Sequence, residues 1–99
     1  MEIKIKSIHF DTTEKLQAFI EKKIAKLEKS FEDIQEVEAQ LKVEKPATAD
    51  NKTVSLSVSV PGKTLFVEKT SETFEESTDL CVDSMRNQLQ KFKEKLRER

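Results

Sequence analysis

Apolar and polar residues alternate in four segments of the chain, and this period of two predicts four half-buried β-strands. The four segments are residues 3–6, 37–44, 54–60 and 64–69. Pro61 and Gly62 predict a hairpin turn between the last two strands, with Leu65 and Val67 facing the core. Residues 46–51 are polar and predict a further turn.

Apolar residues at intervals of three and four predict two amphipathic helices. The first runs from Thr13 to about Phe31, with candidate N-caps at residues 11–13. The second begins at Thr73, which forms a capping-box pattern with Glu76, and runs towards Arg97. The expected apolar faces are Leu16, Phe19, Ile20, Ile24, Leu27 and Phe31 on the first helix, and Phe74, Cys81, Met85, Leu89, Phe92 and Leu96 on the second.

The element order β-α-β-β-β-α predicts an α+β fold. Each strand has one apolar face and each helix one apolar stripe, so we expect two layers, a four-stranded mixed sheet with both helices on one face. The first βαβ unit predicts parallel pairing of strands one and two, and the remaining pairs should be antiparallel.

Length and composition narrow the class of protein. The 99 residues are enough for one domain spanning 1–99. A single cysteine cannot close an intrachain disulfide, which excludes a disulfide-stapled secreted scaffold. No signal peptide, transmembrane segment or lipidation motif stands out in the sequence, so we expect a soluble cytoplasmic protein that does not bind membranes.

The net charge of −1 argues against a uniformly basic nucleic-acid coat, yet the charges are segregated along the chain. Residues 1–30 carry seven lysines and five acids, and residues 84–99 carry six basic residues and two acids. Residues 31–50 and 68–83 each hold six acids, against two lysines and one lysine. Binding depends on the local potential, so the two basic blocks decide which partners fit.

The basic residues lie in stripes on both predicted helices. At about 100° per residue, Lys15, Lys22, Lys26 and Lys29 share one narrow stripe of the first helix, and Lys23 lies between it and the apolar face. On the second helix Arg86, Lys93 and Arg97 lie on one flank, and Lys91 and Lys95 on the other. Either stripe alone could be a solvated face. Two such helices on one sheet face favour a shared patch for phosphates.

Residues with catalytic chemistry are scarce. His9 is the single histidine, Cys81 falls on an apolar stripe, and Gly62 alone cannot form a phosphate-binding loop. We therefore expect no enzyme, no metal site and no cofactor. The chain has no Trp or Tyr, and most of its six Phe fall on core faces, which argues against a base-stacking platform and favours recognition of structured RNA by shape and phosphate contacts.

Four short motifs extend this interpretation: Thr13-Glu14, Ala25-Lys26-Leu27-Glu28, Leu41-Lys42-Val43-Glu44-Lys45 and Lys91-Phe92-Lys93-Glu94-Lys95-Leu96. With the element order and length, they resemble the short ribosome hibernation-promoting factors of bacteria. That family includes ribosome-associated inhibitor A and was formerly called the sigma-54 modulation proteins. The resemblance covers nearly the whole chain.

The resemblance implies a fold similar to double-stranded-RNA-binding domains. It also implies binding to the small ribosomal subunit and its rRNA, in the channel of mRNA and tRNA, to silence idle ribosomes in stationary phase or under stress. The residues that match basic positions of the family are Lys23, Lys26, Lys91, Lys93, Lys95 and Arg97. Helix geometry alone adds Lys22, Lys29 and Arg86 to the candidate RNA-binding set.

The chain also departs from the family pattern. The last helix of the family usually starts Asp-hydrophobe-Tyr-Ala-Ala, whereas residues 73–77 here are Thr-Phe-Glu-Glu-Ser. The C-terminal dimerisation domain of longer members is not expected, so pairing of ribosomes would need a separate dimerising factor. Two alternatives stay open: a protein-interaction module that associates through a sheet edge, and a binder of another structured RNA. DNA is not an expected partner.

Overall fold

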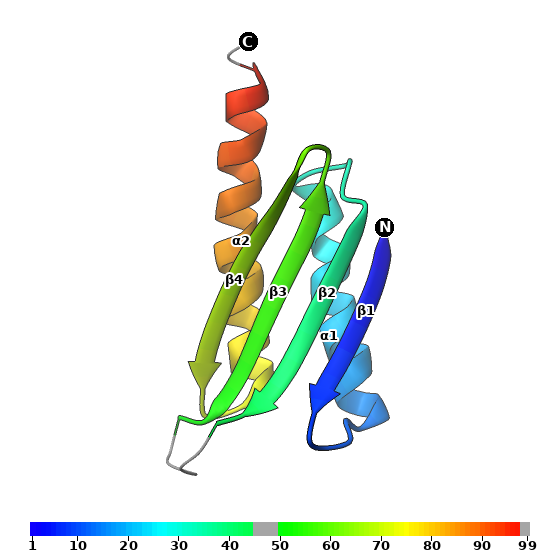
Figure 1. The fold of residues 1–99 in the computed structure, drawn as a ribbon, viewed down its shortest axis with the longest axis vertical. Helices are drawn as coiled ribbons and strands as arrows, with labels where there is room; N and C mark the ends of the chain where they lie inside the picture. The colour runs from blue at the N-terminus through cyan, green and yellow to red at the C-terminus, as the bar shows by residue number, and fades with distance from the viewer. Residues whose placement is uncertain (45–49, 98–99) are drawn as a thin grey trace.

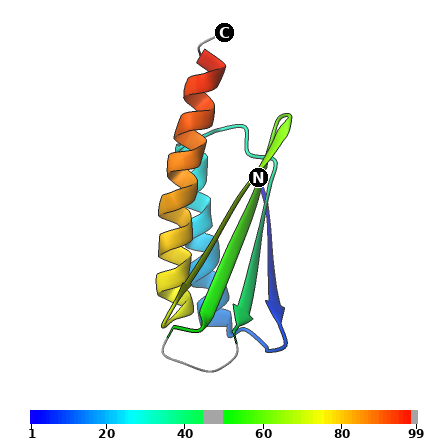
Figure 2. The ribbon, with the colours of Figure 1, turned by 60° about the vertical axis from the view of Figure 1, so that its left-hand side comes forward.

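A computed structural model describes residues 1–44 and 50–97 of the chain. Its elements are β1 (Glu2–Ile8), α1 (Glu14–Ala25), the 3-10 helix η1 (Lys26–Lys29), β2 (Glu36–Val43), β3 (Lys52–Val60), β4 (Lys63–Ser71) and α2 (Phe74–Arg97). Both helices lie on the same face of one sheet (Figures 1 and 2). The predicted order and the two-layer α+β architecture are therefore confirmed.

The four strands are arranged in the order β1-β2-β3-β4. β1 pairs with β2 in parallel, and the two later pairs are antiparallel, as predicted. A parallel pair needs a long crossover, which α1 supplies. One row across the sheet joins Ile5, Ala39, Leu56 and Val67, and it faces the helices. The alternation in sequence therefore corresponds to one inward face across all four strands.

The core lies between this inward face and the two helices. The expected inward positions Leu65 and Val67 are buried. Completely buried apolar side chains come from the central strands and both helices: Val37, Ala39, Leu41, Val54, Leu56, Val58, Ile20, Ile24, Leu27, Cys81, Met85 and Leu89. The other sheet face is polar on β1 and β2, where Lys4 Nζ lies 3.0 Å from Glu36 Oε1. One face of the mixed sheet is thus apolar and covered by the helices.

Hydroxyl side chains begin both helices. Thr13 Oγ1 accepts the Leu16 backbone N–H at 3.1 Å, and Thr73 Oγ1 accepts the Glu76 N–H at 3.0 Å. These bonds satisfy N–H groups that the first helical turn leaves without partners. Ser77, on α2, donates to the Lys52 carbonyl at 2.6 Å and lies 2.7 Å from Ser71 Oγ. The start of α2 is therefore joined to β3 and β4.

The first helix is less regular than the sequence predicts. The α-helix ends at Ala25, and the chain continues as η1, where the Ser30 N–H bonds to the Leu27 carbonyl at 3.0 Å. Leu27 and Phe31 are nevertheless buried, so the apolar stripe continues beyond the end of the α-helix. In the predicted 46–51 turn, residues 46–49 lie outside the described residues. Within the described part, the Glu44 N–H bonds to the Asn51 carbonyl at 2.8 Å.

The prediction that Leu96 belongs to the core was wrong. Its side chain is 46% exposed, although Leu89, two turns earlier, is completely buried. The α2 helix has 24 residues, and its last turns extend beyond the end of the sheet (Figure 1). No part of the sheet lies beneath these turns, so helical periodicity alone cannot bury Leu96 there.

Candidate nucleic-acid interface

The predicted RNA-binding residues lie on the helix layer, and most of them are exposed. The exposed ones are Lys22, Lys26, Lys29, Arg86, Lys91, Lys95 and Arg97, and the half-buried ones are Lys23 and Lys93. The structure divides the residues on α2 among separate hollows and gives Lys23 a partner within the protein. The candidate interface therefore combines exposed cations on both helices with one lysine, Lys23, that is paired within the protein.

Lys23 joins the two helices. Its Nζ lies 3.1 Å from Asp79 Oδ1 of α2 and 5.4 Å from the centre of the Phe19 ring. The side chain is only 28% exposed, so it lies along the flank of α1 as expected from its position between the two stripes. A phosphate that approaches Lys23 must therefore compete with the Asp79 carboxylate.

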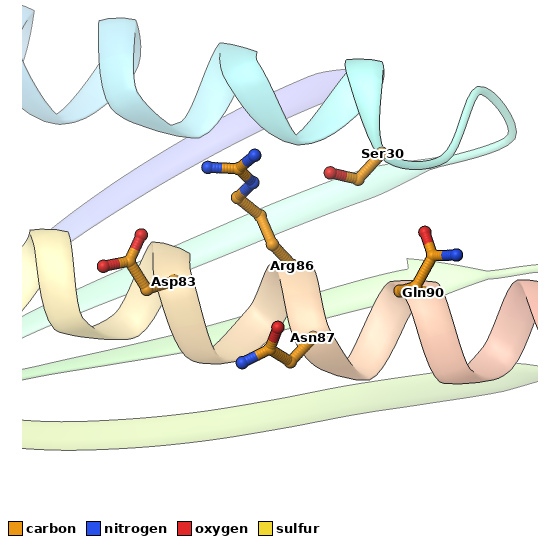
Figure 3. Close-up of a pocket in the computed structure, with 5 residues that line it drawn as sticks. All are labelled: Ser30, Asp83, Arg86, Asn87 and Gln90. Atoms are coloured by element: carbon orange, nitrogen blue, oxygen red, sulfur yellow. The ribbon is translucent and has the colours of Figure 1, made fainter.

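A polar hollow of about 420 Å³ lies between the end of η1 and the middle of α2. Its lining residues are Ser30, Asp83, Arg86, Asn87 and Gln90. Figure 3 shows the Arg86 side chain pointing from α2 towards the ribbon of the facing helix, with its guanidinium group directed away from Ser30. Among the ion pairs of the described residues, Arg86 has no partner, although Asp83 shares the hollow. Arg86 thus offers a guanidinium group to an incoming anion, beside amides that could form hydrogen bonds with it.

Lys91 and Lys95 lie on a different side of α2 from Arg86. They line a second hollow together with Lys63, the first residue of β4. Lys93 lines a third hollow, which contains Glu32 and Asp33. Helical periodicity separates these two flanks of α2 but does not connect Lys63 with either flank, because Lys63 lies about 30 positions earlier in the chain.

The charges along α2 follow the helix dipole. Glu75 and Glu76 occupy its first turn, and Lys95 and Arg97 occupy its last. Acids near the N-terminus and bases near the C-terminus are both favourable in the dipole field. The basic end is also the part that extends beyond the sheet (Figure 1), so its cations are accessible to a large partner.

Candidate groups for other chemistry are few in the described residues. Across residues 1–44 and 50–97, no three His, Cys, Asp or Glu side chains lie close enough together to hold a metal ion. None of the helices in that part of the chain combines the length and apolar character needed to cross a bilayer. His9 is exposed and has a left-handed backbone with φ of 65° in the turn after β1.

Burial protects the single thiol. Cys81 is fully buried, and its Sγ donates to the Val54 carbonyl at 3.0 Å. Burial raises the pKa of this thiol from 9.0 to about 11, and the Lys69 backbone N–H and side-chain charge offset only part of that effect. The sequence-based assignment of Cys81 to the core is confirmed.

We expect the native Cys81 thiol to react with iodoacetamide at about pH 8 roughly 100-fold more slowly than the thiol of the urea-unfolded chain. A pKa raised from 9.0 to about 11 lowers the thiolate fraction by that factor. For the same reason its contribution to the free energy of unfolding is complete below about pH 9 and is lost as the pH rises towards 11. Equal alkylation rates in the two states would contradict this description.

Two solved structures share this fold. A ribosomal subunit interface protein from Coxiella burnetii superposes with a TM-score of 0.84 at 24% identity, covering 94% of this chain and 98% of that one. The N-terminal domain of Thermus thermophilus Protein Y superposes with a TM-score of 0.79 at 22% identity, covering 93% and 99%. At these identities the likeness establishes the fold alone.

Sequence comparison establishes the family. Residues 3–97 match the profile described as Sigma 54 modulation protein / S30EA ribosomal protein, and the chain belongs to this family. The ribosome hibernation promoting factor of Escherichia coli K12 is 30% identical over 98 residues, which is 99% of each chain. That of Pseudomonas putida is 28% identical over 95 residues, or 96% of this chain and 89% of the relative. The resemblance drawn from the sequence motifs is therefore confirmed.

Proposed function

We propose that this chain is a ribosome hibernation factor that binds the small ribosomal subunit and occupies the path of mRNA and tRNA. The relatives from Escherichia coli and Pseudomonas putida are named ribosome hibernation promoting factors, and the Coxiella burnetii neighbour is named a ribosomal subunit interface protein. The exposed basic residues on α1, η1 and α2 carry the proposal, because they offer cations to rRNA phosphates on one layer of the molecule.

The mechanism that fits this site is occupancy without chemistry. Lysine and arginine side chains bind backbone phosphates, which positions the protein on folded RNA by shape rather than by base sequence. A domain held in the decoding channel then excludes mRNA and tRNA sterically. The association should be reversible, because each phosphate contact forms by release of condensed counterions and weakens as salt is added.

Cosedimentation with purified small subunits over a range of salt concentrations tests this function. If the exposed basic residues each contact one phosphate, the logarithm of the association constant should fall against the logarithm of salt with a slope of about −5 to −6. Generic duplex RNA as competitor distinguishes ribosomes from another structured RNA. A slope near zero, or association that survives RNase treatment, would favour the alternative of protein contacts through a sheet edge.

Replacing Asp79 by asparagine should strengthen binding to the small subunit by about two- to fivefold, the range of an exposed ion pair. The change frees the Lys23 ammonium from its partner at 3.1 Å and removes a negative charge that would repel rRNA. Binding constants at one salt concentration measure the effect, and Glu75→Gln, in the first turn of α2, controls for the loss of an acid outside the basic hollows. Weaker binding by Asp79→Asn would mean that this carboxylate orients Lys23 for the RNA instead.

A further inference from the structure

A hollow of about 200 Å³ lies between the β3–β4 hairpin and the second half of α2, outside the face that joins the two helices. Its lining residues are Lys63, Leu65, Gln88, Lys91, Phe92 and Lys95. Figure 2 shows the sheet and α2 diverging towards this hairpin. The hairpin turn uses Gly62 with φ of 78°, a left-handed conformation that favours glycine, and Lys63 follows it directly.

The charge of this hollow is unbalanced. It is lined by three lysines and by no acid, whereas the neighbouring hollows around Arg86 and Lys93 each contain at least one carboxylate. Within the described part of the chain, none of these three lysines takes part in an ion pair. Three like charges on side chains that line one hollow make its potential positive, which favours a bound anion.

Two apolar side chains, Leu65 and Phe92, form part of the wall of the hollow. Leu65 is 6% exposed, and the Phe92 ring packs edge-on against Phe31 with their centres 5.4 Å apart. Next to the hollow, Gln88 Nε2 donates to the Phe66 carbonyl at 3.0 Å, which ties α2 to β4. Low-dielectric groups such as Leu65 and the Phe92 ring beside a charged hollow focus the field of its lysines. The space is equivalent to roughly six or seven water molecules, which is enough for a phosphate group.

We propose that Lys63, Lys91 and Lys95 together bind a phosphodiester group of the RNA backbone, and that Lys63 is an RNA-binding residue outside both helices. This inference rests on the proposed function and extends it, because it continues the RNA path from α2 onto the β3–β4 hairpin. Lysine suits this role as a compact point charge that does not require the paired geometry of an arginine fork. No base-reading group is needed, since phosphate contacts position a protein without reading sequence.

The first test compares Lys63→Ala with the wild type for binding to small subunits at several salt concentrations. Loss of one phosphate contact should make the salt slope shallower by about one unit. The control is Lys4→Ala, which removes the same charge from an exposed residue on the opposite sheet face and should leave the slope unchanged. A slope for Lys63→Ala equal to that of the wild type would overturn the inference.

A second test does not depend on ribosomes. Backbone amide chemical shifts are followed while the full chain is titrated with a short RNA duplex or with inorganic phosphate. The duplex should move the amides of residues 62–65 and 88–95 in the wild type but not in Lys63→Ala. If inorganic phosphate moves these amides in the wild type and the duplex does not, the assignment of the site to RNA is overturned. If the duplex moves these amides while small subunits do not bind, the phosphate site stands and the proposed function fails.

Discussion

Replacing Lys22 and Lys26 by glutamine should weaken binding to small ribosomal subunits by about 50- to 100-fold at about 0.1 M salt and make the salt slope shallower by about two units. Both residues are exposed on the helix layer, one on α1 and the other at the start of η1. In the counterion-release description each lost phosphate contact removes about 0.9 of slope, which is roughly eightfold in affinity at this salt concentration. Cosedimentation with purified subunits measures both quantities.

Lys22 and Lys26 are preferred to Lys23 for this test. Changing Lys23 would also break its ion pair with Asp79 and its contact with the Phe19 ring, and so confuse helix packing with RNA binding.

The matched control is the double substitution Lys4→Gln and Lys6→Gln. These lysines lie on the open face of the sheet, where they pair with Glu36 at 3.0 Å and Glu38 at 3.6 Å. The two doubly substituted chains have the same net charge, so a difference between them reports the position of the charges. If both chains bind equally well, the basic helix layer is not the interface.

Leu56→Ala should cost about 3–5 kcal/mol in the free energy of unfolding, measured by urea denaturation. Leu56 is completely buried at the centre of β3, between Ala39 of β2 and Val67 of β4. Removing its side chain leaves a cavity where both the strands and the helices are held rigidly. For a domain of this size the melting temperature should fall by about 10 °C or more.

Leu96→Ala is the control for that experiment, because it deletes the same atoms from a side chain that is 46% exposed. It should change the free energy of unfolding by no more than about 0.5 kcal/mol. The sequence pattern assigns both leucines to the core. If the two substitutions lower the free energy of unfolding by similar amounts, the result supports that pattern and contradicts the exposed position of Leu96.

The fold could be predicted from the sequence because its signals are local. The alternation over 54–60 sets which side of β3 is buried, and the Thr73 hydroxyl that caps α2 is recognisable from its own neighbours. These choices depend on backbone geometry within a few residues, where the period of two or of 3.6 is enough. Parallel pairing of β1 with β2 follows from the single helical crossover between them.

The site was only partly predictable. Helical periodicity placed Lys91 and Lys95 on one flank of α2 and Arg86 on the other, and the structure places these flanks in separate hollows. Helical periodicity could not predict that Asp79 forms an ion pair with Lys23, or that Lys63 lines the same hollow as Lys91. Each of these pairs joins two elements that are far apart in the chain, and the contact depends on how those elements pack.

By itself, the sequence determined the element order, the inward face of each strand, the helix N-termini and the presence of two basic helices, because each of these is set by residues within a few positions of one another. Only the tertiary structure decided that the α-helical part of the first helix ends at Ala25, that Leu96 is exposed, and which charges are already paired. These features depend on where the sheet ends and on how α1 crosses α2, and no local pattern encodes either quantity. The net charge of −1 is therefore compatible with binding to RNA, because packing brings three lysines together around a hollow that no acidic residue lines.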